Sequence, residues 1–318
     1  MNLVFIGASR FGLRCLSACL DLHDWQVTGV VTASKTFAIS YRPTGMTNVL
    51  HADVAQLADT RGIPVRTLCR SMNEPGLLDC VAQWKPDAFL VAGWYHMIPR
   101  SWRNLAPAYG LHASMLPDYG GGAPLVWAMI NGEIKTGVTL FQMDDGVDSG
   151  PIAAQRSGPI YQEGTIATLY ARIEERGLEL VRETLPRLAR GLIKFERQDE
   201  SKRRIMPQRS PEDGLIDWTT GATRIDRFIR AQTKPYPGAF SSLDNAPIHI
   251  WRAEIGAHQG PSVPGEVTRT DDGNFAVGCG QGFVILLEIS YEQRTYTQAQ
   301  LTDVFGGGGS DWANRRAA

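Results

Sequence analysis

The chain has 318 residues, of which 43% are hydrophobic and 20% charged, a composition typical of a globular protein. Lys and Arg number 32 and Asp and Glu 33, giving a net charge of -1. No overall charge therefore attracts the chain to nucleic acid or to an anionic membrane. The length exceeds one ordinary core and predicts two domains.

The cysteines indicate a reducing compartment. Their number is odd and no Cys-x-x-Cys pair occurs, so we expect neither a disulfide framework nor a zinc site. The N-terminus lacks the features of a signal peptide, and no apolar run is long enough to cross a bilayer. These observations predict a cytoplasmic protein without a membrane segment.

The first elements predict a parallel α/β sheet. A buried strand at residues 3–6 leads through a glycine turn into a helix at 13–22 and a second strand at 27–32. The turn lacks the Gly-x-Gly-x-x-Gly spacing, and no acidic residue follows the second strand to hold a ribose. We therefore interpret Gly7 and Gly12 as packing residues rather than as a dinucleotide site.

Two segments follow that are candidates for ligand contact. Residues 33–48 are polar without clear periodicity and predict a long loop, which is often functional. After a helix at 54–61, a buried strand at 86–92 ends at Gly93-Trp94-Tyr95-His96. Ligands of open α/β sheets bind beyond the carboxyl ends of strands. Trp94 and Tyr95 are therefore either ligand-stacking residues or ordinary core aromatics.

The later elements predict a long helix, a linker and a second domain. Residues 165–189 form an amphipathic pattern, and residues 196–211 are charged. Their basic run, residues 202–204, is interpreted as a solvated part of the linker. A helix at 222–232 and several short strands then indicate a small β-barrel or sandwich. The predicted domain limits are 1–205 and 206–304, with a flexible tail at 305–318.

A histidine and an aspartate, 36 positions apart, are the candidate catalytic residues. His112 and Asp148 both lie in glycine-rich turns that flank apolar, strand-like runs. A histidine that titrates near neutrality is a natural proton acceptor, and a carboxylate can fix its tautomer. We expect the two side chains to meet at the carboxyl ends of neighbouring strands and to form one site.

The motifs around these residues resemble a known family. His112-Ala-Ser114-Met-Leu-Pro117 is followed at the family's distance by Gly-Val-Asp148-Ser-Gly150, and Tyr236-Pro-Gly-Ala239 matches its C-terminal module. The chain resembles, over nearly its whole length, the formyltransferases that use 10-formyltetrahydrofolate. That family includes methionyl-tRNA formyltransferase and enzymes that formylate nucleotide-linked amino sugars. The resemblance implies an α/β fold, with a Rossmann-like catalytic domain followed by a small OB-like barrel.

The resemblance also assigns roles to residues. It implies that His112 accepts the proton of the attacking amine and that Asp148 orients His112 and increases its basicity. It implies no metal. It places a set of residues along the folate co-substrate: Trp94, Tyr95, His96, Ser114, Met115, Leu116, Pro117, Gly122, Asp144, Asp145, Gly146 and Val147.

One position departs from the family pattern. An Asn two residues before the catalytic His binds the formyl oxygen in the family, and this chain has Gly110 there. Loss of one such donor typically costs about 100- to 1000-fold in rate. A water, Ser114 or a backbone N–H could replace the donor, or the protein could have left formyl transfer and become a catalytically degenerate folate- or partner-binding protein.

The acceptor is predicted from a second departure. Where relatives often carry basic residues, residues 118–124 contain an acid and three glycines, which argues against transfer RNA. Val126-Trp127-Ala128 and Ile130-Asn-Gly132-Glu133 look more like the sugar-acting branch. The leading expectation is a small amine, a nucleotide-linked amino sugar, with methionyl-tRNA as the alternative. A homodimer is kept open.

Overall fold

The computed structural model describes residues 1–39, 42–243, 246–257 and 260–306, and the chain divides into two compact units. Unit 1 contains Met1–Pro124, Lys135–Pro159 and Ala171–Pro207. Unit 2 contains Leu125–Ile134, Ile160–Tyr170 and the chain from Gln208 onward. The domain limits expected from the sequence stay a prediction.

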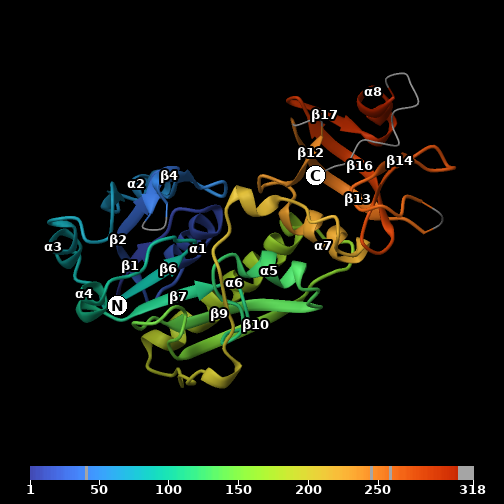
Figure 1. Ribbon diagram of the computed structural model, residues 1–318. Helices are drawn as coiled ribbons and strands as arrows, with labels where there is room; N and C mark the ends of the chain where they lie inside the picture. The colour runs from blue at the N-terminus through green and yellow to red at the C-terminus, as the bar shows by residue number, and fades with distance from the viewer. Residues whose placement is uncertain (40–41, 244–245, 258–259, 307–318) are drawn as a thin grey trace. The chain divides into compact units, whose positions relative to one another are not determined.

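Unit 1 is built on a seven-stranded sheet with the order β10-β9-β7-β6-β1-β2-β5 (Figure 1). The five strands from β7 to β5 run parallel, whereas β9 is antiparallel to both β7 and β10. The bounds are β1 (Asn2–Ile6), β2 (Gln26–Ala33), β5 (Val65–Leu68), β6 (Ala88–Ala92), β7 (Ala108–His112), β9 (Lys135–Gln142) and β10 (Ile152–Pro159). The predicted α/β class is confirmed.

The central strands of this sheet are buried on both faces. Leu3 and Phe5 of β1 point to one face and Val4 and Ile6 to the other, and all four are fully buried. Such continuous apolar strands are typical of a parallel sheet covered on both sides. From the central β1, the chain first adds β2 and β5 toward one edge of the sheet. It then returns to the other side of β1 and adds β6 and β7 toward the opposite edge. A ligand crevice is expected at the carboxyl edge, where this direction reverses.

Helices join and cover the strands of unit 1. They are α1 (Arg10–Leu20), α2 (Val54–Thr60), α3 (Leu77–Ala82), α4 (Arg100–Leu105) and α6 (Ile166–Ala189), of which α6 belongs to unit 1 from Ala171 onward. Glu174 of α6, only 6% exposed, faces Arg10 and Arg14 of α1. Trp102 of α4 is fully buried in a cluster with Phe89 of β6. The contacts of Glu174 join α6 to α1, and those of Trp102 pack α4 against the sheet.

The long loop expected at residues 33–48 is wrong. The segment forms an antiparallel hairpin of β3 (Thr36–Ile39) and β4 (Arg42–Thr47), and its residues 40–41 lie outside the described residues. Phe37 is 8% exposed and packs against the rings of Tyr95 and His96. This tertiary contact gives the hairpin an apolar anchor that the polar sequence does not reveal.

Unit 2 contains an antiparallel sheet with the path β12-β13-β16-β15-β14, to which β17 adds beside β16. Its strands are β12 (Ala239–Leu243), β13 (Ala246–Ile255), β14 (Val267–Arg269), β15 (Phe275–Gly278), β16 (Phe283–Tyr291) and β17 (Arg294–Thr297). Its helices are α5 (Pro124–Ile130, in the unit from Leu125), α7 (Ala222–Gln232) and α8 (Leu301–Phe305). Closure into an OB-like barrel stays a prediction.

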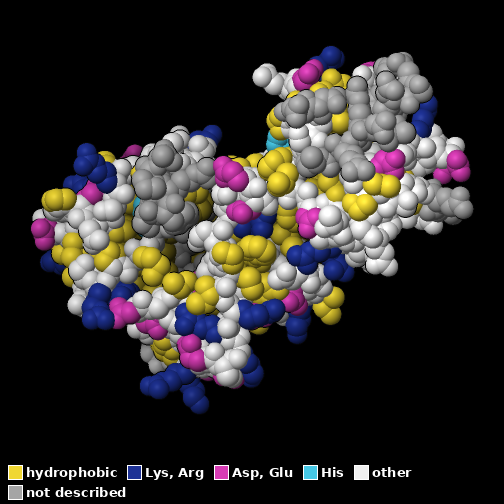
Figure 2. Space-filling view, in the orientation of Figure 1, with side chains coloured by type: hydrophobic (Ala, Val, Ile, Leu, Met, Phe, Trp, Pro, Cys, Tyr) yellow, Lys and Arg dark blue, Asp and Glu magenta, His cyan; other side chains and the backbone are white. Residues whose placement is uncertain are grey.

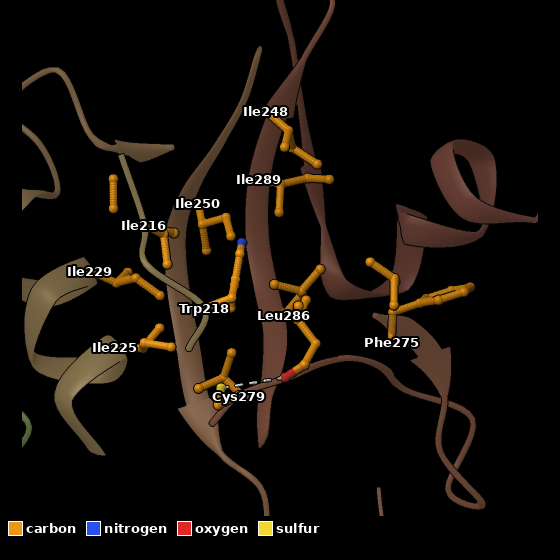
Figure 3. Close-up of a cluster of buried hydrophobic side chains, with 14 of the residues drawn as sticks. Ile216, Trp218, Ile225, Ile229, Ile248, Ile250, Phe275, Cys279, Leu286 and Ile289 are labelled. Carbon is orange, nitrogen blue, oxygen red and sulfur yellow. Dashed lines mark hydrogen bonds between the residues drawn. The ribbon is translucent and has the colours of Figure 1, made fainter. Parts of the chain in front are cut away.

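One apolar cluster joins the sheet of unit 2 to its helices (Figure 3). Ile225 and Ile229, four positions apart on α7, pack with Trp218 and with Ile250 of β13. Trp218 donates its indole N–H to Ser241 Oγ at 3.0 Å, so its one polar atom is satisfied. Phe305, where the predicted tail begins, ends α8 and is 1% exposed. Residues 307–318 of that tail lie outside the described residues.

Short elements complete the chain. They are β8 (Gly120–Gly121), β11 (Ile205–Met206) and the 3-10 turns η1 (Glu200–Lys202), η2 (Pro211–Gly214) and η3 (Gln298–Gln300). Within the described ranges, no helix combines the length and apolar character that crossing a bilayer requires.

Candidate active site

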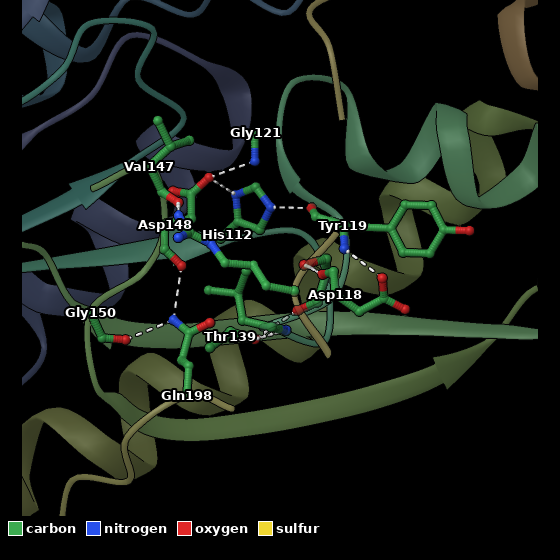
Figure 4. Close-up of polar contacts among 12 residues, drawn as sticks. His112, Asp118, Tyr119, Gly121, Thr139, Val147, Asp148, Gly150 and Gln198 are labelled. Atoms are coloured by element: carbon green, nitrogen blue, oxygen red, sulfur yellow. Dashed lines mark hydrogen bonds and ion pairs between the residues drawn. The ribbon is translucent and has the colours of Figure 1, made fainter. Parts of the chain in front are cut away.

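His112 is the last residue of β7, and the residue is buried with 9% exposure. The ring nitrogen Nε2 lies 2.8 Å from the backbone carbonyl oxygen of Tyr119 (Figure 4). Because a carbonyl only accepts, Nε2 carries the hydrogen in this arrangement. The second nitrogen, Nδ1, therefore holds the lone pair of the neutral ring.

Asp148 faces that second nitrogen. Its Oδ2 atom lies 3.4 Å from His112 Nδ1, and the same oxygen accepts the backbone N–H of Gly121 at 2.8 Å. The Asp148 side chain is 19% exposed, which limits screening of the interaction by water. A proton accepted at Nδ1 would point at a carboxylate, so the pair can stabilise an imidazolium.

The prediction that the two side chains meet at the carboxyl ends of neighbouring strands is wrong, although they do lie close together. β7 and β9 are antiparallel, and Tyr109 at the start of β7 pairs with Gln142 at the end of β9. Asp148 instead comes from the loop between β9 and β10. Asp148 adopts φ +52°, which is uncommon for a residue other than glycine. The loop conformation therefore determines the geometry of the pair.

Backbone groups of two further residues belong to the site and were missed by sequence reasoning. The Tyr119 carbonyl fixes the His112 tautomer, and the Gly121 N–H holds Asp148. Tyr119 also has a left-handed backbone, with φ +55°. A run of three glycines is the only sequence signal near them, because any residue type supplies a backbone carbonyl.

Gly110 lies in β7 two residues before His112, and the space beside it is filled. A Cβ atom built on Gly110 would lie 2.7 Å from Met143 Cε and 3.0 Å from Phe141 Cε1. Apolar side chains thus occupy the volume next to Gly110, and the residue itself offers no side-chain donor.

The aromatic residues after β6 form a small cluster. The rings of Trp94 and His96 lie 5.4 Å apart, and those of Phe37 and His96 lie 5.3 Å apart. Burial lowers the pKa of His96, and Glu74 partly opposes this. The Nε1 atom of Trp94 and the Nε2 atom of His96 are buried without a hydrogen-bond partner in the part of the chain that the structure describes. Tyr95 instead donates its hydroxyl to Asn48 Oδ1 at 3.0 Å.

The predicted folate residues at positions 114–122 lie mainly in the framework beside His112. Ser114 is 1% exposed and donates to the Asp118 carbonyl at 2.7 Å, and Leu116 is 3% exposed. Met115 packs close to Gly137 of β9, and Pro117 is partly buried. The Gly122 N–H donates to the Met206 carbonyl at 2.9 Å.

The predicted residues at 144–147 stabilise the loop that carries Asp148. Asp144 Oδ1 accepts the Gly146 N–H at 3.0 Å and the Ser149 hydroxyl at 2.6 Å. Asp145 pairs with the guanidinium groups of Arg100 and Arg103 on α4. These two cations hold the pKa of the Asp145 carboxyl well below its usual range. Val147 is 40% exposed.

The basic run at residues 202–204 is not simply a solvated linker. Arg204 donates to Asp118 Oδ2 at 2.6 Å and lies over the Tyr119 ring, 4.5 Å from its centroid. Arg203 donates to the Val147 carbonyl at 2.6 Å. Only Lys202, 75% exposed, keeps the predicted solvated character. We call residues 196–206 the strap, because β11 within it pairs with β8 and it contacts both loops around His112.

The remaining features of the described residues concern surface charge and metal binding. On the face drawn in Figure 2, Lys and Arg side chains are interspersed with Asp and Glu and form no single basic field. Within the described ranges, no three His, Cys, Asp or Glu side chains gather to hold a metal ion.

Comparison with known proteins gives the family. Residues 1–185 match the formyl transferase model, and residues 209–303 match the model of the formyl transferase C-terminal domain. Methionyl-tRNA formyltransferase of Citrifermentans bemidjiense is 34% identical over 296 residues, covering 92% of this chain and 89% of that protein.

Two solved structures share the fold. The N-formyltransferase from Helicobacter canadensis, in complex with folinic acid and dTDP-3-aminofucose, has a TM-score of 0.65 and 18% identity, covering 92% of this chain and 99% of that one. A variant of HypX from Aquifex aeolicus has a TM-score of 0.64 and 21% identity, covering 98% of this chain. This chain spans about half of HypX, or 49% of its length. With both family models matched in order along the chain, the protein belongs to the formyltransferase family.

Proposed function

We propose that the protein transfers the formyl group of 10-formyltetrahydrofolate to a primary amine, with His112 as the proton acceptor. The observation that carries this proposal is a buried imidazole whose Nδ1 faces the Asp148 carboxylate at 3.4 Å. The Tyr119 carbonyl keeps the hydrogen of the neutral ring on Nε2, and the Asp148 carboxylate faces the other ring nitrogen. Membership of the family supports both the reaction and the folate donor.

In this reaction the amine nitrogen forms a bond to the formyl carbon, and the bond between that carbon and N10 of the folate breaks. The amine loses a proton to the His112 imidazole, and the imidazolium returns it to N10. Asp148 stabilises the imidazolium between these two transfers. A positioned base of this kind typically contributes ~10²–10⁴-fold in rate.

The donor site is proposed beside the aromatic cluster. Buried polar atoms normally have partners, and Trp94 Nε1 and His96 Nε2 have none among the described residues. A heteroaromatic ring such as a pterin could supply acceptors and donors to both. The contacts assigned to residues 114–117, Gly122 and 144–147 stay predictions.

Two acceptors are supported by different observations. The 34% identity to methionyl-tRNA formyltransferases, over both matched domains, supports methionyl-tRNA as the first candidate. A nucleotide-linked amino sugar is the second candidate. Asp118 beside the glycine run supports it, because its carboxylate offsets the charge of Arg204, which a phosphate backbone would otherwise attract. The cytoplasmic location and the homodimer stay predictions.

A catalytically degenerate binding protein is the competing hypothesis, and apolar Met143 and Phe141 beside Gly110 favour it. Mixing the purified protein with 10-formyltetrahydrofolate and either methionyl-tRNA or a panel of nucleotide-linked amino sugars tests it. We expect tetrahydrofolate release with one acceptor class, and its loss in His112→Ala with folate affinity retained by calorimetry.

Folate binding without release for any acceptor would instead establish the binding protein. Binding without turnover in His112→Ala, together with full activity in wild type, would identify His112 as the base. Unchanged turnover in His112→Ala would overturn the proposed mechanism.

A further inference from the structure

We propose that Gln198, in the strap, is a positioning residue that holds Asp148 in reach of His112. The inference rests on the function proposed above, since it concerns the same pair. Gln198 Nε2 donates to the Asp148 carbonyl at 2.8 Å and to the Gly150 carbonyl at 2.7 Å (Figure 4). Both hydrogens of the amide are thus directed at the loop that carries the carboxylate.

The backbone of that loop needs such support. Asp148 adopts φ +52°, and residues held in this region persist only when their surroundings determine them strongly. Beyond Asp148, the loop is closed tightly: a Cβ atom on Gly150 would lie 1.8 Å from the Gln142 carbonyl oxygen. By bonding the carbonyls on both sides of Ser149, Gln198 fixes the turn in which Asp148 reverses direction.

The strap that carries Gln198 is itself anchored to the sheet. Glu196 and Ile152 of β10 exchange two backbone hydrogen bonds, at 2.7 and 2.9 Å. Farther along, Arg203 donates to the Val147 carbonyl at 2.6 Å. Gln198 therefore connects the reacting loop to a rigid edge of the seven-stranded sheet rather than to a free segment.

The oxygen of the Gln198 amide makes it possible to distinguish a positioning role from simple packing. Its Oε1 atom is buried and has no hydrogen-bond partner among the described residues. An unsatisfied buried acceptor costs folding free energy. An apolar residue of similar size removes this cost but also takes the N–H donors from the Asp148 and Gly150 carbonyls, so the two effects on stability oppose each other. A loss of activity without a loss of stability would then reveal what the two N–H donors do.

The test compares Gln198→Leu with Lys202→Ala as a matched control. Lys202 lies on the same strap but is 75% exposed and pairs with Asp199. We expect kcat of Gln198→Leu to fall by about 10- to 100-fold, the range that a misplaced group can cost, with KM for the folate and the melting temperature little changed. Lys202→Ala should match wild type in all three.

A second measurement needs no substrate. In protein labelled with ¹⁵N at histidine, the signal of His112 is identified by its absence in His112→Ala. We expect the Nδ1 signal of Gln198→Leu to move toward that of Asp148→Asn, and that of Lys202→Ala to stay at the wild-type position. Gln198→Glu keeps the shape of the side chain but turns both donors into acceptors, which the two carbonyls repel, so its His112 signal should also leave the wild-type position.

The outcomes separate this inference from the proposed function. If wild type transfers formyl to no acceptor, the proposed function fails while the NMR measurement still decides on Gln198. Wild-type His112 signals in Gln198→Leu would overturn the positioning role, as would a fall in kcat that is matched by a fall in melting temperature.

Discussion

At the scale of single residues, the surroundings of Gly110 determine whether an amide side chain can be restored there. Met143 Cε and Phe141 Cε1 lie 2.7 and 3.0 Å from the position of an added Cβ. We expect Gly110→Asn to lower the free energy of unfolding by about 1–3 kcal/mol, the usual cost of overpacking, without a gain in formyl transfer. Urea unfolding and tetrahydrofolate release measure both.

The double variant Gly110→Asn/Met143→Ala tests whether Met143 is the obstacle to the Asn side chain. Met143→Ala removes the nearest obstructing atom, so the two changes should couple, as contacting residues do. We expect the double variant to be more stable than the sum of the single variants predicts, and to transfer formyl faster than Met143→Ala. A stable Gly110→Asn variant with increased activity would show that Met143 moves freely.

A second residue-scale prediction concerns pH. Burial raises the pKa of Glu174, and Arg10 and Arg14 offset this only in part. Because the folded-state pKa lies above the unfolded value near 4.5, the native state binds more protons in the window between them. The contribution to stability is therefore complete below 4.5 and is lost as the pH rises through the folded-state pKa.

Glu174→Gln removes this titration. We expect the stability of wild type relative to Glu174→Gln to decrease as the pH rises from about 4 to 7, the direction that linkage requires. Urea unfolding at several pH values measures it, with Glu179→Gln, a 41% exposed glutamate on the same helix, as a control. A stability difference independent of pH would contradict the shift.

At the scale of elements, the pairing of β8 with β11 depends on one glycine. Gly121 has φ +89°, and a Cβ atom there would lie 2.5 Å from the Met206 carbonyl oxygen. We expect Gly121→Ala to cost about 1–3 kcal/mol of stability, as strained backbone does. It should also lower kcat, because the Gly121 N–H binds Asp148.

Gly120→Ala is the matched control for stability. Its nearest neighbours to an added Cβ lie 3.7 Å away, an ordinary contact, and its φ is not positive. Thermal unfolding of the two variants side by side measures the difference. Equal losses would mean that the backbone angle at Gly121 carries no special strain.

Elements also explain where sequence reasoning succeeded and failed. The strands around β1 and β6 were predictable because buried parallel strands are continuous apolar runs. The hairpin of β3 and β4 was not, because Phe37 supplies its anchor through a contact distant in sequence. The proximity of His112 and Asp148 was predicted from motif and chemistry, whereas the carbonyl of Tyr119 could not be predicted, because every residue type has one.

At the scale of the whole molecule, unit 2 is discontinuous in sequence. It takes in residues 125–134 and 160–170 besides the chain from Gln208 onward. Within it, Arg209 lies over the Trp127 ring at 4.7 Å, and Arg230 donates to the Gly164 carbonyl at 2.7 Å. The sequence did not predict these two early segments as parts of unit 2, because no local pattern indicates a contact with residues that follow much later in the chain.

A fragment of residues 208–318 should therefore be less stable than the same unit in the full chain. It keeps the six-stranded sheet and α7 but lacks the partners of Arg209 and Arg230. Circular dichroism during heating should show a lower midpoint for the fragment than for the corresponding transition of the full protein. An equal midpoint would mean that the two early segments contribute nothing to unit 2.

The same discontinuity has a consequence for synthesis on the ribosome. α5 leaves the exit tunnel long before the rest of unit 2 has been translated, and Leu125, Val126 and Ile130 of α5 are buried in the finished protein. During that interval their apolar surface lacks the late partners of its own unit. Because transiently exposed apolar surface promotes aggregation, the nascent chain is expected to be most vulnerable between the emergence of α5 and that of α7.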